Sequence, residues 1–342
     1  MIFIAVKVFE LSATERKIIH SIQDLVKRNN IDNIARTEAY FRYYQENKEI
    51  KWSFLAHMVS RNAGWNMCDL EGKWIPKVID KHERDVLFHT YEKANWLIFQ
   101  DAFPQLLLYQ YSTKNKEAMF HLLPFFHVSK FMEQEWEYYW HSKDHVRILI
   151  ALIINEQNMI QKPVIDNPFY RRSVFRTSLF SFQDWFHYSC VLLPTVHGEL
   201  FGASVSGFRI VDKRIDLGKR LASILFHKNL YPYFYEFAKK TIHTGSRDDY
   251  EQYLHDYPRS KTTPLRRTFP IINHHDQRLK DWSKLKKIKP KWFSHTIHHR
   301  HPVCITKWFK GKQKTLHKAI LVKEIFVRKF HFHKNKEEIV ED

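Results

Sequence analysis

Glycine is scarce in this chain. The sequence has 8 glycines in 342 residues, about 2% where soluble proteins average ~7%. Phosphate-binding loops and tight hairpins use most glycine, because they need backbone conformations with positive φ. No glycine-rich loop runs into Lys-Ser or Lys-Thr, and G-x-G-x-x-G is absent, so the P-loop and dinucleotide-binding classes are excluded. Scarce glycine favours a helical fold.

Cysteine is also rare. The three cysteines, Cys68, Cys190 and Cys304, are far apart, odd in number and form no C-x-x-C. This spacing excludes a disulfide framework and a cysteine-rich zinc module. We therefore expect the protein to work in a reducing compartment, the cytoplasm.

Long apolar runs are missing as well. The longest run after the first residues is Ile148 to Ile154, seven residues, whereas a membrane span needs about twenty. The start, MIFIAVKVFE, places its apolar residues before the first lysine, whereas a secretory signal begins with positive charge. We expect neither a transmembrane segment nor a secretory signal.

Standard enzyme signatures are absent too. H-E-x-x-H does not occur, and GASVSG at 202–207 is one residue longer than a nucleophile elbow. His197 and Glu199 imitate the deaminase H-x-E, but no P-C-x-x-C follows. The C-terminal histidines match no standard zinc spacing: His295, His298, His299, His301, His331 and His333, with Cys304. We predict no metal site and no cofactor.

The abundant residues are aromatic. The chain has 27 Phe, 16 Tyr and 10 Trp, and 44% of its residues are hydrophobic, which argues for a folded globular protein. We predict a mainly α multi-helix globular bundle with irregular loops around 163–215 and a basic C-terminal region. For 163–215 three alternatives stay open: loops, short helices, or a small strand pair near 199–211. The expected helices run from a Ser12–Glu15 capping box to about Lys27, from Asn33, and over 82–102 (ended by Pro104), 129–142, 145–160, 218–229 and 232–242.

Positive charge is concentrated behind residue 260. Residues 261–336 contain 21 Lys or Arg against three acids, a net of +18, while residues 1–260 sum to +4 and the last six residues to −4. This shift divides the chain into a helical body, 1–260, and a basic, aromatic-containing region, 261–342, packed on or following the body. Lysines interleaved with aromatics favour binding of a polyanion.

The expected partner is nucleic acid, and the alternative is a peripheral protein of an anionic membrane surface or a scaffold protein. A solvated basic surface with core aromatics would explain the same composition. The candidate polyanion-binding residues are Lys284, Lys286, Lys287, Lys289, Lys291, Trp292, Lys307, Lys310, Lys312 and Lys314.

Residues 52–68, WSFLAHMVSRNAGWNMC, contain one charged side chain, Arg61. The pattern predicts a helix with Gly64 as its C-cap and with Ser53, His57, Ser60 and Arg61 on one stripe. So little charge indicates that the helix is enclosed, and enclosed polar groups need partners. The stripe is either an internal network or a pocket in which His57 is an acid or base and Arg61 binds an anion.

HTGSRDDYE, residues 243–251, has Ser246 and Asp249 at capping-box spacing. A helix cap explains this stretch. The functional alternative is that Gly245 turns backbone amides outward, where Arg247 and His243 help to hold a phosphate or carboxylate.

Together the two stretches suggest an enzyme or small-ligand binder as the alternative function. In that case the side chains that would meet in space are His57, Arg61, Asn62, Asn66 and Asp69 with His243, Ser246 and Arg247. Asp69 and Asp101 are further candidate catalytic acids. Apolar neighbours of Asp101 in WLIFQDAF would raise its pKa.

Three strings resemble a known family: RTEAYFRYY (36–44), AHMVSRNAGWNMCDL (56–70) and HTGSRDDYE (243–251). In this order and at these separations they resemble the YppC-like proteins of Bacillus and its relatives, over about residues 30–260. The family is a domain of unknown function. The resemblance implies a bacterial cytoplasmic protein and brings no catalytic residues to carry over.

Overall fold

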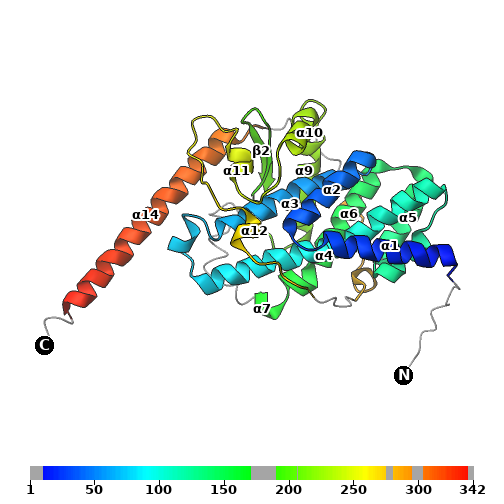
Figure 1. Cartoon of the computed structure of the whole chain (residues 1–342), viewed down its shortest axis with the longest axis horizontal. Coiled ribbons are helices and arrows are strands. Elements are labelled where there is room, and N and C mark those ends of the chain that lie inside the picture. Colours follow the sequence, from blue (N-terminus) through cyan, green and yellow to red (C-terminus); the bar gives the residue numbers. More distant parts are fainter. Residues whose placement is uncertain (1–10, 171–189, 206, 275–279, 295–302, 338–342) are drawn as a thin grey trace, which may run out of the picture.

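The computed structural model describes residues 11–170, 190–205, 207–274, 280–294 and 303–337, with side chains for all of these except Tyr170 and residues 323–337. The chain is mainly α-helical, as predicted, with one small hairpin (Figure 1). The helices are α1 (Ala13–Asn29), α2 (Asn33–Glu46), α3 (Lys51–Asp69), α4 (Lys81–Asn115), α5 (Lys130–Ser142), α6 (His145–Met159), α7 (Pro168–Tyr170), α9 (Val211–Leu225), α10 (Tyr231–Lys240), α11 (Asp248–Glu251), α12 (Leu265–Thr268), α13 (Lys291–Ser294) and α14 (Thr306–Glu337). Short helical turns are η1 (Ile75–Lys77), η2 (Phe120–Phe126), η3 (Gln161–Ile165) and η5 (Trp282–Lys284).

Helix starts follow local sequence signals. Ser12 and Glu15 form the predicted capping box of α1, each side chain accepting a hydrogen bond from the other residue's backbone N–H. Asp80 and Glu83 do the same for α4. These boxes satisfy N–H groups that have no partner inside the helix, so the starts are encoded by a few neighbouring residues.

Two predicted helix ends are wrong. Pro104 lies inside α4, which continues to Asn115. Proline in a helix interior loses a hydrogen bond, but the following turn buries Leu106 and Leu108 completely, and this packing outweighs the local cost. Gly64 is likewise internal, because α3 continues to Asp69.

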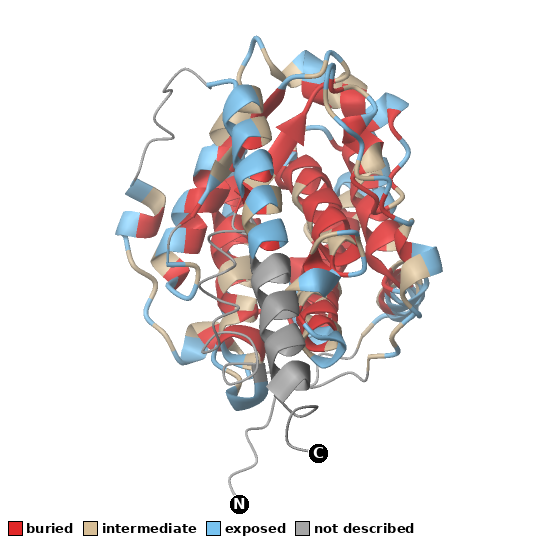
Figure 2. Ribbon diagram, turned by 90° about the vertical axis from the view of Figure 1, so that its left-hand side faces the viewer, coloured by how far each residue is buried: buried red, intermediate tan, exposed pale blue. Residues whose placement is uncertain are grey.

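Helix α3 is the centre of the body. It packs against α2, α4, α6, α9 and β1, and most of its side chains are buried, as Figure 2 shows for the interior as a whole. Ser53, His57, Ser60 and Arg61 are all less than a tenth exposed. The prediction that charge is withheld because the helix is enclosed is confirmed.

The hairpin lies against α3 and α9. Strands β1 (Cys190–Pro194) and β2 (Leu200–Ser204) pair antiparallel, with Leu192 opposite Gly202. Gly202 has φ +148°, and a Cβ there would lie 2.1 Å from the Val191 carbonyl oxygen, so only glycine fits. Of the alternatives left open for 163–215, a strand pair is present, and it begins at Cys190, earlier than 199.

The segment after residue 260 first packs on the body and then leaves it. The Trp282 indole donates to Asn155 of α6 (2.8 Å), and the Trp292 indole donates to Asp212 of α9 (2.9 Å). Helix α14 packs near its start and then extends away from the body (Figure 1). The division at residue 260 stays a prediction.

No helix in the described ranges is long and apolar enough to cross a membrane. Two features considered in the sequence lie outside the described residues: the apolar start, 1–10, and the histidines between 295 and 301. The side chains of His331 and His333 also lie outside them.

Candidate functional site

The two motif stretches lie side by side at the end of α3. Arg247 donates from Nε to Asp69 Oδ2 (2.5 Å) and from Nη2 to Asn66 Oδ1 (3.3 Å). The Trp65 indole donates to Asp249 Oδ2 (3.0 Å). Residues about 180 positions apart in the sequence are therefore joined by hydrogen bonds, and Asp69, Asn66 and Arg247 form one cluster.

Asp249 faces inward, so the predicted capping box is wrong. Helix α11 begins after Arg247 and has no side-chain cap. Burial by itself would raise the pKa of Asp249, but hydrogen bonds from His243, Thr244 and Trp65 lower it overall. The His243 ring lies between two acceptors, Asp249 Oδ2 (3.1 Å) and Asn33 Oδ1 (2.9 Å). His243 therefore connects α2 to the 243–251 stretch.

His57 and Arg61 belong to an internal network. His57 Nδ1 donates to the Thr37 carbonyl (2.9 Å), and Arg61 Nε donates to His57 Nε2 (3.0 Å). Burial, followed by the charge of Arg61, holds the pKa of His57 well below its usual value. Arg61 Nη2 donates to the Thr241 carbonyl (2.5 Å) at the C-terminal end of α10, where a cation is favoured. These contacts link α2, α3 and α10.

Asn62 and Ser246 also hold segments together. The Asn62 side chain accepts from the Leu192 N–H (2.7 Å) and donates to the Leu192 carbonyl (2.8 Å), which fixes β1 to α3. Ser246 Oγ donates to the Thr262 carbonyl (2.6 Å) and accepts from the Asp248 N–H (3.1 Å). Both side chains are buried, and these hydrogen bonds are made to other parts of the fold.

Asp101 lies in a separate buried network. Its Oδ2 accepts from Gln105 Nε2 (2.7 Å) and from Asn155 Nδ2, while its Oδ1 has no partner. Burial raises the pKa of Asp101 to about 7, in the direction predicted. The structure does not bring Asp101 together with Asp69 or His57, and it lines neither cavity described below.

Position 64 must be glycine because α2 and the 243–251 stretch come very close to the backbone of α3 there. A Cβ at this position would lie 2.6 Å from Asn33 Oδ1 and 2.8 Å from His243 Cε1. We expect Gly64→Ala to lower the free energy of unfolding by about 1–3 kcal/mol, the usual cost of overpacking, measured by urea denaturation. Gly311→Ala is the matched control, because a Cβ there meets nothing within 4 Å, and it should raise stability by about 0.5–1 kcal/mol. Equal effects of the two substitutions would contradict this explanation of Gly64.

A small cavity adjoins the Asp69–Arg247 cluster. It has a volume of about 220 Å³ and lies between the end of α3, the segment after α11 and the first turns of α14. Asp69 and Arg247 are the predicted site residues that line it; His57, Arg61 and His243 do not. The wall includes residues that the sequence analysis missed: Lys73, Trp74, Glu251, Tyr257, Arg259, Ser260 and His317. They come from three distant segments, so no local spacing identifies them.

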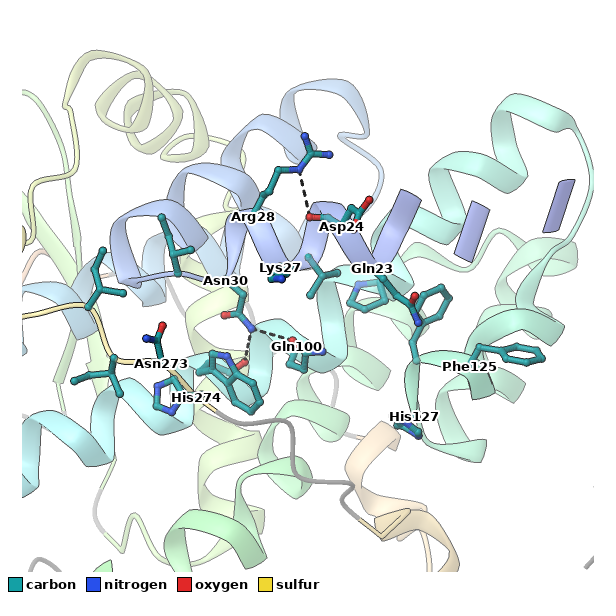
Figure 3. Close-up of a pocket in the computed structure, with 17 residues that line it drawn as sticks. Gln23, Asp24, Lys27, Arg28, Asn30, Gln100, Phe125, His127, Asn273 and His274 are labelled. Carbon is teal, nitrogen blue, oxygen red and sulfur yellow. Dashed lines mark hydrogen bonds between the residues drawn. The ribbon is translucent and has the colours of Figure 1, made fainter. Parts of the chain in front are cut away.

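A larger groove lies on another face. It has a volume of about 1040 Å³ and runs between α1, α4, η2 and residues 271–274 (Figure 3). Its wall combines exposed apolar side chains, such as Phe125 and Ile271, with the polar side chains of Lys27 and Asn30. None of the predicted site residues lines this groove.

The lysines of 284–291 are partly neutralised by the body. Lys289 and Lys291 pair with Asp212 of α9 at 3.1 and 2.7 Å, and Lys286 donates to Asn158 (3.0 Å). Trp292 is 2% exposed, so the expectation that it binds a polyanion by stacking is wrong: its ring has no face open to a base. Lys284 and Lys287 remain exposed.

The lysines of α14 lie differently. Lys307, Lys312 and Lys314 are exposed, while Lys310 is half-buried and donates to the His255 carbonyl. No acidic residue occurs between 303 and 322. The part of this helix up to residue 322 therefore presents cations without a carboxylate of its own.

Comparison with known proteins confirms the resemblance seen in the three motifs. The model of the family described as "Protein of unknown function (DUF2515)" matches residues 28–310. The chain is 42% identical to the uncharacterized protein YppC of Bacillus subtilis (strain 168) over 311 residues, which cover 90% of this chain and 96% of the relative. No solved structure matches the chain. The chain therefore belongs to the DUF2515 family.

Proposed function

We propose that this is a cytoplasmic protein that binds nucleic acid through the outer face of α14. The observation that carries the proposal is a stripe of four lysines on α14. Lys307, Lys314 and Lys318 are exposed, and Lys310 lies at the edge of the stripe, half-buried and bonded to the His255 carbonyl. Their spacing of three or four residues places them on one side of an α-helix. The opposite stripe, made of Phe309, Gln313, Leu316 and Ile320, is buried.

The stripe is open to a partner. The outer side of the described part of α14 is exposed in Figure 2, and a Cβ at Gly311 would meet nothing within 4 Å. From Lys307 to Lys318 the helix rises about 16 Å, a length over which duplex DNA carries about ten phosphates. Among the described residues, none of these four lysines is ion-paired with a carboxylate. Neutralising phosphates would release counterions, which drives binding.

Lys284 and Lys287 are exposed as well and extend the candidate surface. Lys286, Lys289 and Lys291 already have partners in the fold, so they contribute less free charge. The lysines of α14 are therefore the stronger candidates for polyanion contact.

Replacement of Lys307, Lys310, Lys314 and Lys318 by Gln tests the proposal. Anisotropy of a labelled DNA duplex, measured against a salt series, should show a steep decrease in wild-type affinity with salt. Each phosphate contact contributes about −0.9 to the slope of log affinity against log salt. The fourfold variant should bind at least about tenfold more weakly at low salt and lose up to about 3.6 units of slope.

The matched control removes four exposed lysines of the body, Lys17, Lys114, Lys162 and Lys228. It has the same net charge as the α14 variant, so equal losses in both would show that total charge, and not α14, binds the duplex. Absence of binding by the wild-type protein at low salt would contradict the proposal. Sedimentation with anionic but not neutral liposomes, together with no DNA binding, would identify a membrane surface as the partner instead.

A further inference from the structure

We propose that the cavity beside Asp69 and Arg247 binds a phosphate group, free or carried by a small phosphomonoester, between Arg247 and Lys73. The cavity is closed on one side by α14, through Gln313, Leu316 and His317. This site is separate from the lysine stripe, because it lies on the inner side of the same helix.

The side chain of Arg247 is fixed by hydrogen bonds and keeps N–H groups that can donate to an anion. Its side chain is 10% exposed, and three acceptors fix it: Asp69 on Nε, Tyr250 Oη on Nη1 (2.6 Å) and Asn66 on Nη2. A guanidinium has five N–H groups, so these bonds leave one N–H on each terminal nitrogen. Guanidinium N–H groups without a partner can donate hydrogen bonds to an oxyanion.

The carboxylates of the cavity wall are already engaged. Asp69 pairs with Arg247, and Glu251 accepts from both the backbone N–H (2.6 Å) and the hydroxyl (2.7 Å) of Ser260. Against these two acids the wall carries three cations, Lys73, Arg247 and Arg259. Arg259 lies 3.6 Å from Asp248 at the surface, whereas Lys73 has no carboxylate partner among the described residues. Counted over the wall alone, there is one more cation than carboxylate, and Lys73 is the wall cation without a carboxylate partner among the described residues.

His317 lies on the cavity wall together with these cations. Its ring stacks on Trp74 at 4.0 Å between centroids and an interplanar angle of 12°. The pKa of His317 is lowered to about 4, first by burial and then by the charges of Lys73 and Arg247. Burial disfavours any charge at this position, whereas the contributions of Lys73 and Arg247 have the sign that favours an anion, so it is these two cations that recommend the cavity for an anionic ligand.

The volume limits the ligand. A cavity of about 220 Å³ is smaller than the ~300–1,000 Å³ typical of drug-sized ligands and cofactors. One water occupies about 30 Å³ in the liquid, so the space holds a phosphate with several waters, or a phosphate on a short carbon chain. The site is therefore assigned to a compact ligand.

The test is titration of the full-length protein with inorganic phosphate and, separately, with glycerol phosphate, followed by calorimetry. We expect saturable binding with a Kd on the order of 1 mM or tighter. Lys73→Gln should weaken binding about tenfold, because a charged hydrogen bond is lost. Lys73 is exposed, so this variant should fold. Lys114→Gln, on a remote exposed lysine, is the matched control and should bind as the wild type does.

A second measurement tests whether the phosphate binds in this cavity. Bound phosphate close to His317 should raise its pKa from about 4 by at least about one unit, followed by NMR of the histidine ring. The variant without the four outer lysines of α14 should bind phosphate normally, so failure of nucleic-acid binding and failure of this site are distinguishable. Binding that does not saturate, that is unchanged in Lys73→Gln, or that leaves His317 unaffected would overturn the inference. Preference for glycerol phosphate over phosphate would identify a phosphomonoester as the ligand.

Discussion

The Asp101→Asn variant is expected to gain about 4 kcal/mol of stability relative to the wild-type protein as pH rises from about 4 to about 8. The pKa of Asp101 is about 7 in the folded protein, against 3.8 for an ordinary aspartate. Between these values the folded state holds a proton that the unfolded state has lost. The free energy of unfolding of the wild type therefore falls as pH rises, by about 1.36 kcal/mol per pH unit. Asparagine cannot ionise and removes this contribution.

Urea denaturation at several pH values gives the free energy of unfolding of the wild type and of Asp101→Asn. The difference between the two is the quantity to follow with pH, because the contributions of other titrating groups cancel in it. Glu117→Gln is the control, because Glu117 is exposed, and its difference from wild type should stay nearly constant with pH. A flat difference for Asp101→Asn as well would contradict the buried-acid explanation. The physical cause is the position of Asp101, whose Oδ1 has no hydrogen-bond partner, so the ionised form is poorly solvated.

Removal of one partner from the Arg36–Glu92 pair should have an effect of similar size. Arg36 Nη2 donates to Glu92 Oε1 (2.6 Å) and Oε2 (2.5 Å), and the side chains are 1% and 4% exposed. Glu92→Gln leaves the guanidinium buried without a counter-charge, and the free energy of unfolding should fall by about 3–5 kcal/mol. Chemical denaturation measures this loss.

The double variant Arg36→Met with Glu92→Leu should be more stable than Glu92→Gln. It removes both charges together and leaves neither one unpaired, which is often nearly neutral. The exposed pair Lys81–Asp85, 76% and 42% exposed, supplies the control: Asp85→Asn should cost less than about 1 kcal/mol. If the double variant is less stable than Glu92→Gln, the cost does not come from an isolated buried charge.

Predictions from the sequence succeeded where a few neighbouring residues decide the structure. The start of α1 is one such case, because Ser12 and Glu15 satisfy each other's backbone groups. Predictions from the sequence failed where tertiary packing opposed a local signal. Pro104 did not end α4, and Gly64 did not cap α3 but makes room for Asn33 and His243. Trp292 resembled a stacking platform by composition, yet Asp212 and the core hold it inside.

In the candidate site, too, the sequence indicated some features and only the tertiary structure decided others. The residue types in the two motif stretches indicated polar groups in need of partners, because a chain with so much charge had placed almost none in residues 52–68. Which groups met depended on the fold: Arg247 pairs with Asp69 across about 180 positions, and α14 supplies His317 to the same cavity.

Composition and periodicity are properties of neighbouring residues, so they were sufficient for the helical class, the enclosed helix α3 and the location of the basic region. The separation of lysines into those paired with Asp212 and those left open on α14 required the tertiary structure. An ion pair or a cavity depends on distances between segments that are remote in the chain, and these distances exist only once the core has packed.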